Sequence, residues 1–169
     1  DLTDMIDTAI DQYEIGSEPD QKTTASAGNA QKETSRTSAR EHTLAGIVLS
    51  IHGTTFMEEV TFCPYLPYEG LPFSETLTAH FQVPVYLENE ANLSAIGEHT
   101  FYFHKSSMIF VSVHSGIGMG IIFDNELFRG VCGKAGEFGH SIVERDGRPC
   151  PCGNKGCLEQ YASEQAILK

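Results

Sequence analysis

The sequence predicts an α/β domain that carries a metal-binding loop. Short apolar runs of strand length alternate with segments of helical spacing along residues 44–128, and this alternation is typical of α/β folds. One histidine and three cysteines follow close together, and their side chains are common metal ligands. These residues are His140, Cys150, Cys152 and Cys157, and they predict a metal loop over residues 136–160.

The N-terminal segment predicts a short amphipathic helix followed by a linker. Apolar residues recur there at helical spacing with acidic residues between them, so we place a helix over residues 1–15. Between Gly16 and Thr43 no large apolar residue occurs, which predicts a flexible linker over residues 16–43. Residues 44–169 then form the main domain.

The main domain begins with a predicted hairpin and a connecting loop. Leu44–Ile51 is an apolar run suited to a buried strand, and His52–Thr55 has the character of a turn. Phe56–Phe62 predicts a returning strand with a polar centre of two glutamates. The cluster of prolines and tyrosines over Pro64–Pro72 is typical of a loop.

Two helices and a strand are expected next. Ser74 is a candidate N-cap for a helix that runs through Phe81, and Pro84–Leu87 has the composition of a strand. Asn89 is the candidate N-cap of a second helix that ends near His99.

The last part of the domain predicts adjacent strands and a terminal helix. Met108–Val113 and Ile117–Phe123 are nearly continuous apolar runs of strand length. Asp124 and Asn125 predict a turn into a further short strand. After the metal loop, Leu158–Leu168 has helical spacing.

The ligand chemistry of the loop predicts a structural zinc site. Zinc binds Cys sulfur and His nitrogen in tetrahedral geometry, and these four residues fill every position, which leaves none for a reactive water. The alternative is that the cysteines are ordinary thiols or half-cystines of a secreted domain. The odd total of five cysteines and the close spacing of three of them argue against this alternative.

Composition restricts the partners of the chain. The 169 residues include 23 Asp and Glu against 11 Lys and Arg, so these residues form a poor surface for phosphate backbones and direct nucleic-acid binding is not expected. No apolar stretch approaches the length of a membrane span, and no signal peptide is recognisable. The cysteine usage predicts a reduced, cytoplasmic setting.

Three glycines stand at alternate positions between two predicted strands. Backbone amides in such a segment can approach an anion or a sugar closely, so Gly116, Gly118 and Gly120 are candidates for a phosphate loop. No Lys-Ser or Lys-Thr follows and the next element is a strand, which excludes a Walker loop and a dinucleotide fingerprint. A tight β-turn without a ligand is an equal alternative.

Polar residues follow the strand that ends near Glu88. In Glu88–Asn92 an amide and carboxylates stand side by side, and such groups can bind vicinal hydroxyls, while a carboxylate can also act as a base. The alternative is helix capping by Asn89, with the acids complementing the helix dipole. If a metal closes the loop, Glu137, His140 and Glu159 are drawn together and form a second set suited to a polyol.

Taken in order, these motifs resemble the ROK family of repressors, open reading frames and kinases. The resemblance spans Leu44 to Ser163 and includes the Glu-Asn-acid-Ala-Asn strand end, Gly-Ile-Gly-x-Gly, and Arg129-Gly. Ala-Gly-Glu-Phe-Gly-His and Cys-x-Cys-Gly-Asn-x-Gly-Cys-Leu-Glu then follow, and the signature from Gly136 to Glu159 is highly specific.

The resemblance implies a ribonuclease-H-like, actin-like ATPase fold, present here in part, with two lobes around a sugar cleft. The helix over residues 1–15 would belong to the first lobe. The same resemblance implies that His140 and the three cysteines hold Zn²⁺. It also implies a sugar-binding set that consists of Asn89, Glu90, Glu137, His140 and Glu159.

Two departures from the kinase pattern stand out. Kinases of the family carry an Asp catalytic base where this chain has Glu90, and one methylene displaces a base by more than an ångström. Residues 1–43 hold no Asp-x-Gly-Gly-Thr phosphate loop. Glu90 resembles the xylose-repressor-type regulators more than the kinases. We therefore expect a longer protein whose DNA contacts come from a domain absent from this chain, and the family resemblance implies a homodimer.

Three functions follow as hypotheses. The first is the sugar-sensing domain of a ROK-type transcriptional regulator, stabilised by zinc, in which ligand shifts an equilibrium between open and closed states. The second is an ATP-dependent, glucokinase-like sugar kinase, in which Glu90 is the base and Mg-ATP the donor. The third is a zinc-stabilised interaction module with a degenerate site.

Overall fold

The computed structural model describes residues 3–8 and 44–168, and the chain separates into two compact units, residues 1–45 and residues 46–169. In the first unit residues 3–8 are helical. The rest of the helix expected over residues 1–15, and the linker expected over 16–43, lie outside the described residues.

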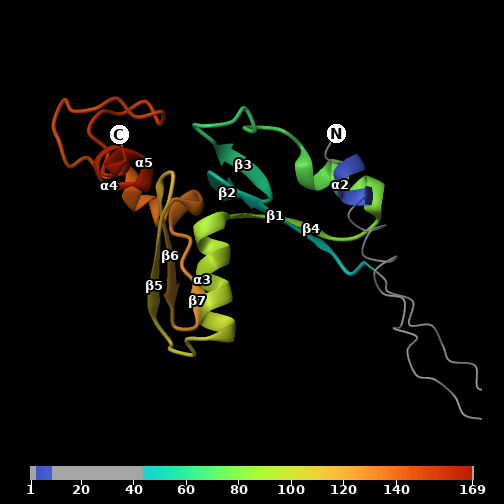
Figure 1. Cartoon of the computed structure of the whole chain (residues 1–169). Helices are drawn as coiled ribbons and strands as arrows, with labels where there is room; N and C mark the ends of the chain where they lie inside the picture. Colours follow the sequence, from blue (N-terminus) through green and yellow to red (C-terminus); the bar gives the residue numbers. More distant parts are fainter. Residues whose placement is uncertain (1–2, 9–43, 169) are drawn as a thin grey trace, which may run out of the picture. The chain divides into compact units, whose positions relative to one another are not determined.

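The second unit is an α/β domain, as predicted (Figure 1). No helix among the described residues is long and apolar enough to cross a bilayer. In chain order the elements are β1 (Ile47–Ile51), β2 (Thr54–Phe56), β3 (Glu59–Phe62), α2 (Phe73–Phe81), β4 (Val85–Asn89), α3 (Glu90–Phe101), β5 (Met108–Val113), β6 (Ile117–Phe123), β7 (Glu126–Leu127), η1 (Val131–Gly133), η2 (Glu137–His140), α4 (Glu159–Ala162) and α5 (Glu164–Ile167).

Strands β1 and β4 pair in parallel, and this pairing sets the position of the polar strand end. The register runs from Ile47 opposite Val85 to Ile51 opposite Asn89. Helix α2 lies on the connection between the two strands and buries Leu77, which is 1% exposed. Both strands therefore end at the same edge, where β4 passes directly into α3.

The returning strand expected over Phe56–Phe62 is interrupted. Met57 and Glu58 have φ angles of 50° and 63°, so they form a two-residue turn between β2 and β3. The turn expected over His52–Thr55 is correspondingly shorter, because Thr54 already pairs with Phe62.

Two predicted features of the helices are wrong, and one is right. Ser74 does not cap α2; its hydroxyl donates to the Val85 carbonyl at 3.0 Å and so ties the helix to β4. The single helix expected over Leu158–Leu168 is divided at Ser163, whose extended backbone ends α4 and whose side chain caps α5. Asn89 caps α3, as expected.

The meander β5–β6–β7 is antiparallel, and α3 packs closely against it. Asp124 and Asn125 have φ angles of 51° and 67° and make the predicted turn into β7. The close approach depends on Gly120 in β6, because a Cβ there would stand 2.5 Å from both the Ala91 carbonyl oxygen and the Ala95 Cβ. Absence of a side chain at this position allows α3 to lie directly on the sheet.

This packing predicts opposite outcomes for two glycine-to-alanine substitutions. Gly120→Ala should lower the free energy of unfolding by about 1–3 kcal/mol, because backbone and a buried methyl must move apart. Gly97→Ala, in the interior of α3 with no atom within 4 Å of the new Cβ, should raise it by about 0.5–1 kcal/mol. Urea titrations followed by circular dichroism give both values, and equal effects would contradict the packing described.

Candidate functional site

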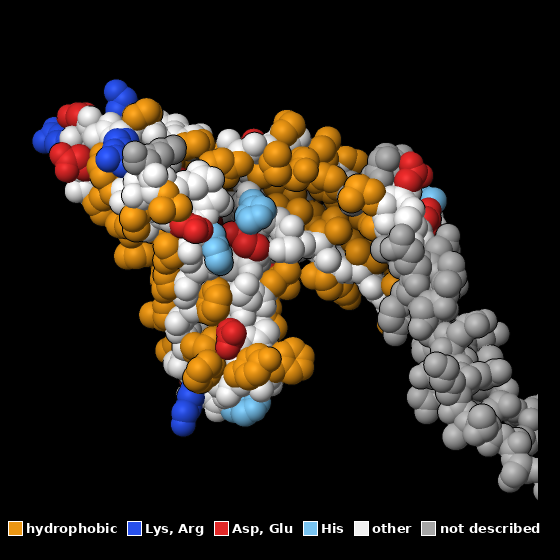
Figure 2. Space-filling model, in the orientation of Figure 1, with side chains coloured by type: hydrophobic (Ala, Val, Ile, Leu, Met, Phe, Trp, Pro, Cys, Tyr) orange, Lys and Arg blue, Asp and Glu red, His pale blue; other side chains and the backbone are white. Residues whose placement is uncertain are grey.

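A cleft of about 450 Å³ lies in the second unit, lined by β4, β6, η2, α4 and the loop after β3. Acidic and histidine side chains gather in a hollow of the surface (Figure 2). The lining includes all the side chains predicted for sugar binding, namely Asn89, Glu90, Glu137, His140 and Glu159.

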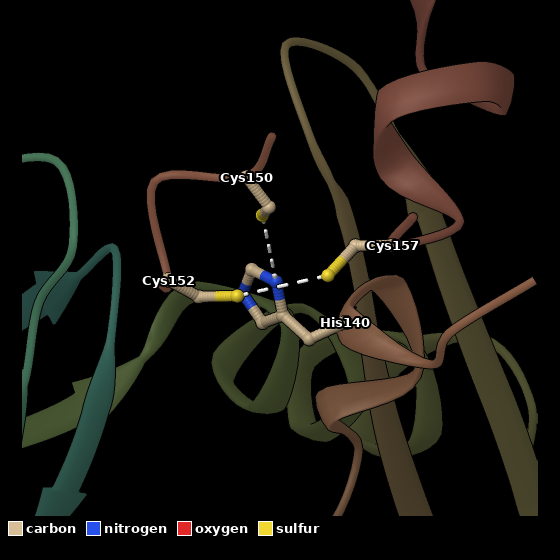
Figure 3. Close-up of side chains that lie close together, drawn as sticks. All are labelled: His140, Cys150, Cys152 and Cys157. Carbon is tan, nitrogen blue, oxygen red and sulfur yellow. Dashed lines mark hydrogen bonds between the residues drawn. The ribbon is translucent and has the colours of Figure 1, made fainter. Parts of the chain in front are cut away.

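The structure also brings together the four predicted metal ligands. One ligand atom from each of His140, Cys150, Cys152 and Cys157 lies within 4.8 Å of all the others, and the side chains point toward one another (Figure 3). The Sγ atoms of Cys152 and Cys157 are 3.6 Å apart, and Cys150 Sγ is 3.6 Å from His140 Nδ1. A tetrahedral ion with thiolate bonds of about 2.3 Å needs separations of about 3.5–3.8 Å. The residues therefore fit a tetrahedral metal.

Backbone hydrogen bonds shape this loop. Cys150 donates its N–H to the Asn154 carbonyl at 2.9 Å, and Gly153 donates to the Cys150 carbonyl at 3.0 Å, which folds the tip into a tight turn. Burial raises the pKa of the Cys150 and Cys157 thiols, because a thiolate there has little water around it. A divalent cation would supply the charge that stabilises both thiolates.

His140 connects the metal cluster to the cleft. Its Nδ1 faces Cys150, whereas its Nε2 lies 3.8 Å from Glu137 Oε2. The pKa of Glu137 is raised, mainly because burial disfavours the charged carboxylate. The ring is held by η2, which Gly139 allows to lie against the Ile117 carbonyl of β6.

Glu159 is the most deeply buried of the cleft carboxylates, with 4% of its surface exposed. Its Oε1 accepts a 2.6 Å hydrogen bond from the Tyr65 hydroxyl and a 3.2 Å bond from Gln160 Nε2. Burial, followed by the bond to Glu159, raises the pKa of Tyr65, so the phenol stays a neutral donor. Sequence reasoning did not identify Tyr65; its place in the Pro/Tyr-rich loop was the only signal.

Asn89 serves the helix and also lines the cleft. Its Oδ1 accepts from the backbone N–H groups of Ala91 and Asn92, so the capping alternative is confirmed. Its Nδ2 donates to the Gly53 carbonyl at 3.0 Å and to Glu90 Oε2 at 3.2 Å. These hydrogen bonds fix the orientation of the Asn89 side-chain amide at the end of β4.

Glu90 projects into the cleft beside a histidine that sequence reasoning did not identify. Glu90 Oε1 lies 3.4 Å from His52 Nδ1, and the Glu90 side chain is about one-third exposed at 32%. Both residues are in the cleft lining. A carboxylate in this position can accept a hydrogen bond or a proton from a hydroxyl of a bound molecule.

An ion pair between the buried Glu88 and the half-exposed Arg129 supports the end of β4. Glu88 is 8% exposed, and its Oε2 accepts from Arg129 Nε at 2.9 Å and from Arg129 Nη2 at 2.8 Å. Its Oε1 accepts from Asn92 Nδ2 at 2.9 Å. Because both carboxylate oxygens have partners, the burial of this charge is compensated. Sequence reasoning had only the Arg129-Gly motif as a signal for this pair.

The glycine-rich segment divides between two roles. Gly116 and Gly118 line the cleft, and a Cβ at Gly116 would stand 3.0 Å from Glu159 Oε2. Gly120 lies outside the cleft lining, where it packs under α3.

The chain is similar to regulators and to kinases. Xylose repressor from Bacillus subtilis (strain 168) is 40% identical over 129 residues, which are 75% of this chain and 34% of that protein. Glucokinase from Streptomyces coelicolor is 41% identical over a shorter stretch of 112 residues, 65% of this chain and 35% of that protein. The chain thus spans about a third of the length of these curated relatives.

The fold is similar to that of a ROK family glucokinase from Streptomyces griseus, solved in complex with glucose and AMPPNP. The TM-score is 0.70 at 35% identity, and the match covers 76% of this chain and 42% of that one. The predicted resemblance, closer to the xylose-repressor type of regulator than to the kinases, is confirmed by these relatives. Residues 11–169 match the sequence model of the ROK family, and the chain belongs to that family.

Proposed function

We propose that this chain is the sugar-sensing region of a ROK-type transcriptional regulator. The observation that carries the proposal is that five side chains able to hydrogen-bond to hydroxyls line one cleft, and that one of them, His140, also belongs to the cluster that could hold a metal. The two-lobed, actin-like ATPase fold, a cytoplasmic setting and a homodimeric assembly are parts of the same proposal. Contact with DNA would come from a domain other than the described residues.

The chemistry of the cleft suits a polyol. The carboxylates of Glu90, Glu137 and Glu159 accept hydrogen bonds from hydroxyl groups, and His140 Nε2 lies beside Glu137 at the same wall. A buried carboxylate that loses its partner costs free energy, so a ligand lacking a matching hydroxyl binds less well. A sugar fits these requirements better than an apolar or an anionic ligand.

The proposed metal is zinc, in a structural role. His140 and the three cysteines would fill all four tetrahedral positions, so the ion would shape the loop rather than activate water. Bound zinc would supply the charge that keeps the thiolates ionised. His140 Nδ1 faces the cysteines, and Nε2 lies 3.8 Å from Glu137 Oε2.

Regulation rather than catalysis is favoured by Glu90 and by the relatives. Glu90 stands where the kinases of the family carry aspartate, and the xylose repressor matches a longer stretch than the glucokinase does. In a regulator, sugar would bind more tightly to one of two states of the cleft and so change the affinity of an attached reader for DNA.

The second candidate is an ATP-dependent sugar kinase, favoured by the structural likeness to a glucokinase that holds glucose and AMPPNP. Glu90 would take the proton from the attacking hydroxyl, and Gly116 and Gly118 would lie near the transferred phosphate. Mg-ATP would supply that phosphate.

Calorimetric titration tests sugar binding. The metal-loaded protein should bind at least one of D-xylose, D-glucose and N-acetyl-D-glucosamine saturably, and Glu137→Ala should weaken that binding by about tenfold or more, because a charge-assisted hydrogen bond is lost. Glu75→Ala, on the exposed side of α2 and outside this cleft, is the matched control and should leave binding unchanged. Saturable binding of none of the three sugars would contradict the proposal.

Metal analysis and hydrogen exchange test the zinc site. Protein purified without chelator should contain about one zinc per chain, and chelation should speed amide exchange selectively over residues 136–160, because metal binding holds that loop. Cys157→Ala should lose the metal, whereas Cys132→Ala, an exposed cysteine outside the cluster, should keep it. Well below one zinc per chain, or uniform exchange after chelation, would overturn the assignment.

Release of ADP separates the two candidate functions. A regulator should show no sugar-dependent ADP release in a coupled assay with Mg-ATP, using the longest natural form of the protein. Release that falls by at least about a hundredfold in Glu90→Gln would instead establish the kinase, because the amide cannot take a proton.

A further inference from the structure

Tyr65 joins two parts of the cleft that are far apart in the sequence. It follows β3, whereas its partner Glu159 begins α4 after the metal loop, a separation of 94 residues. The hydroxyl-to-carboxylate distance is 2.6 Å, which is typical of a strong hydrogen bond from a hydroxyl to a charged acceptor. Both side chains line the cleft, so this bond lies where the proposed ligand binds.

The bond satisfies a carboxylate that has little access to water. Glu159 is 4% exposed, and an unpaired carboxylate at that depth is costly. A Cβ at Gly116 would stand 3.0 Å from its Oε2, and its Oε1 faces Gln160 Nε2, Cys150 Sγ and the Tyr65 hydroxyl. Of the three donors at Oε1, Tyr65 is the one that also lines the cleft, so it stands where a ligand hydroxyl would reach this carboxylate.

The Tyr65 side chain is only partly buried. It is 51% exposed, so about half of its surface is already in contact with solvent. The nearby hydrogen bonds belong to the base of the loop: Glu69 Oε1 accepts from the Cys63 N–H at 2.9 Å, and Leu66 donates to the Cys63 carbonyl at 3.4 Å. The Tyr65–Glu159 bond therefore ties this loop to the start of α4.

We propose that Tyr65 is a specificity-determining residue whose hydroxyl occupies Glu159 as an internal stand-in for a sugar hydroxyl. A ligand that binds Glu159 must supply a hydroxyl donor in place of the phenol, and its binding frees the Tyr65 loop, residues 64–72. The inference rests on the proposed sugar-binding function and adds that the Tyr65 hydroxyl competes with the sugar for Glu159. Ligands without a donor at that position leave the tyrosine in place.

If Tyr65 competes with the sugar for Glu159, loss of its hydroxyl should raise the sugar affinity. In Tyr65→Phe the empty cleft holds a Glu159 that lacks one donor, whereas the liganded cleft is unchanged. The substitution should therefore raise the affinity for the cognate sugar by at least about threefold, because the sugar no longer has to displace the Tyr65 hydroxyl from Glu159. A residue that merely supports the wall would weaken binding when it is altered.

Calorimetry on the zinc-loaded full chain, with D-xylose and D-glucose as probes, measures this effect. Tyr65→Phe should bind whichever sugar the unaltered chain binds at least about threefold more tightly. Tyr68→Phe is the matched control, because Tyr68 lies in the same loop with its ring packed edge-on against Phe73 at 5.4 Å, and it should leave affinity unchanged. Unchanged or weaker binding in Tyr65→Phe would overturn the proposal.

Hydrogen exchange measured by mass spectrometry gives a readout that needs no ligand. Peptides covering residues 64–72 should exchange faster in Tyr65→Phe than in Tyr68→Phe, and addition of sugar to the unaltered chain should speed their exchange in the same way. If the unaltered chain binds neither sugar, the proposed function fails for these ligands. Hydrogen exchange of residues 64–72 in the two variants then tests the role of the Tyr65–Glu159 bond on its own. Faster exchange in Tyr65→Phe alone supports the bond as a latch, and unchanged exchange rules it out.

Discussion

His140 is the residue on which the candidate site depends, because one imidazole contacts two different environments. Its Nδ1 faces the cysteine cluster at 3.6 Å, and its Nε2 lies 3.8 Å from Glu137 in the cleft. A metal held by Nδ1 would fix the plane of the ring and thereby the position of Nε2. The loop that brings the cysteines together also delivers Glu159 to the same wall, so the metal cluster and the ligand cleft are parts of one structure.

The opposite part of the cleft is held by hydrogen bonds and an ion pair. The parallel pairing of β1 with β4 brings Asn89 to the sheet edge, and the Glu88–Arg129 pair supports that edge. Asn89 then caps α3 and directs its amide toward Glu90. The two parts therefore differ in chemistry: one holds four residues that could bind a metal, and the other rests on a buried charge with hydrogen-bonded partners.

The features that sequence reasoning predicted are those with local causes. Strand runs, the Asn89 cap and the metal ligands follow from side-chain types at short spacing, and the structure agrees with each as a local arrangement. The turn at Met57 and Glu58 could not be predicted, because positive φ is unfavourable for both residues and follows from the pairing of β2 with β3. Partners separated by 94 and 41 residues, as in Tyr65–Glu159 and Arg129–Glu88, leave no periodic signal in the chain.

The most direct measurement compares sugar affinity before and after removal of the metal. Calorimetric titration of the metal-loaded and chelator-stripped protein with D-xylose, under identical buffer conditions, isolates the coupling between the cysteine cluster and the cleft. We predict that stripping weakens binding by at least about tenfold and that one equivalent of zinc restores it, since His140 and Glu159 lose their fixed positions without the ion. Equal affinity in the two forms would contradict the view that the metal shapes the sugar site.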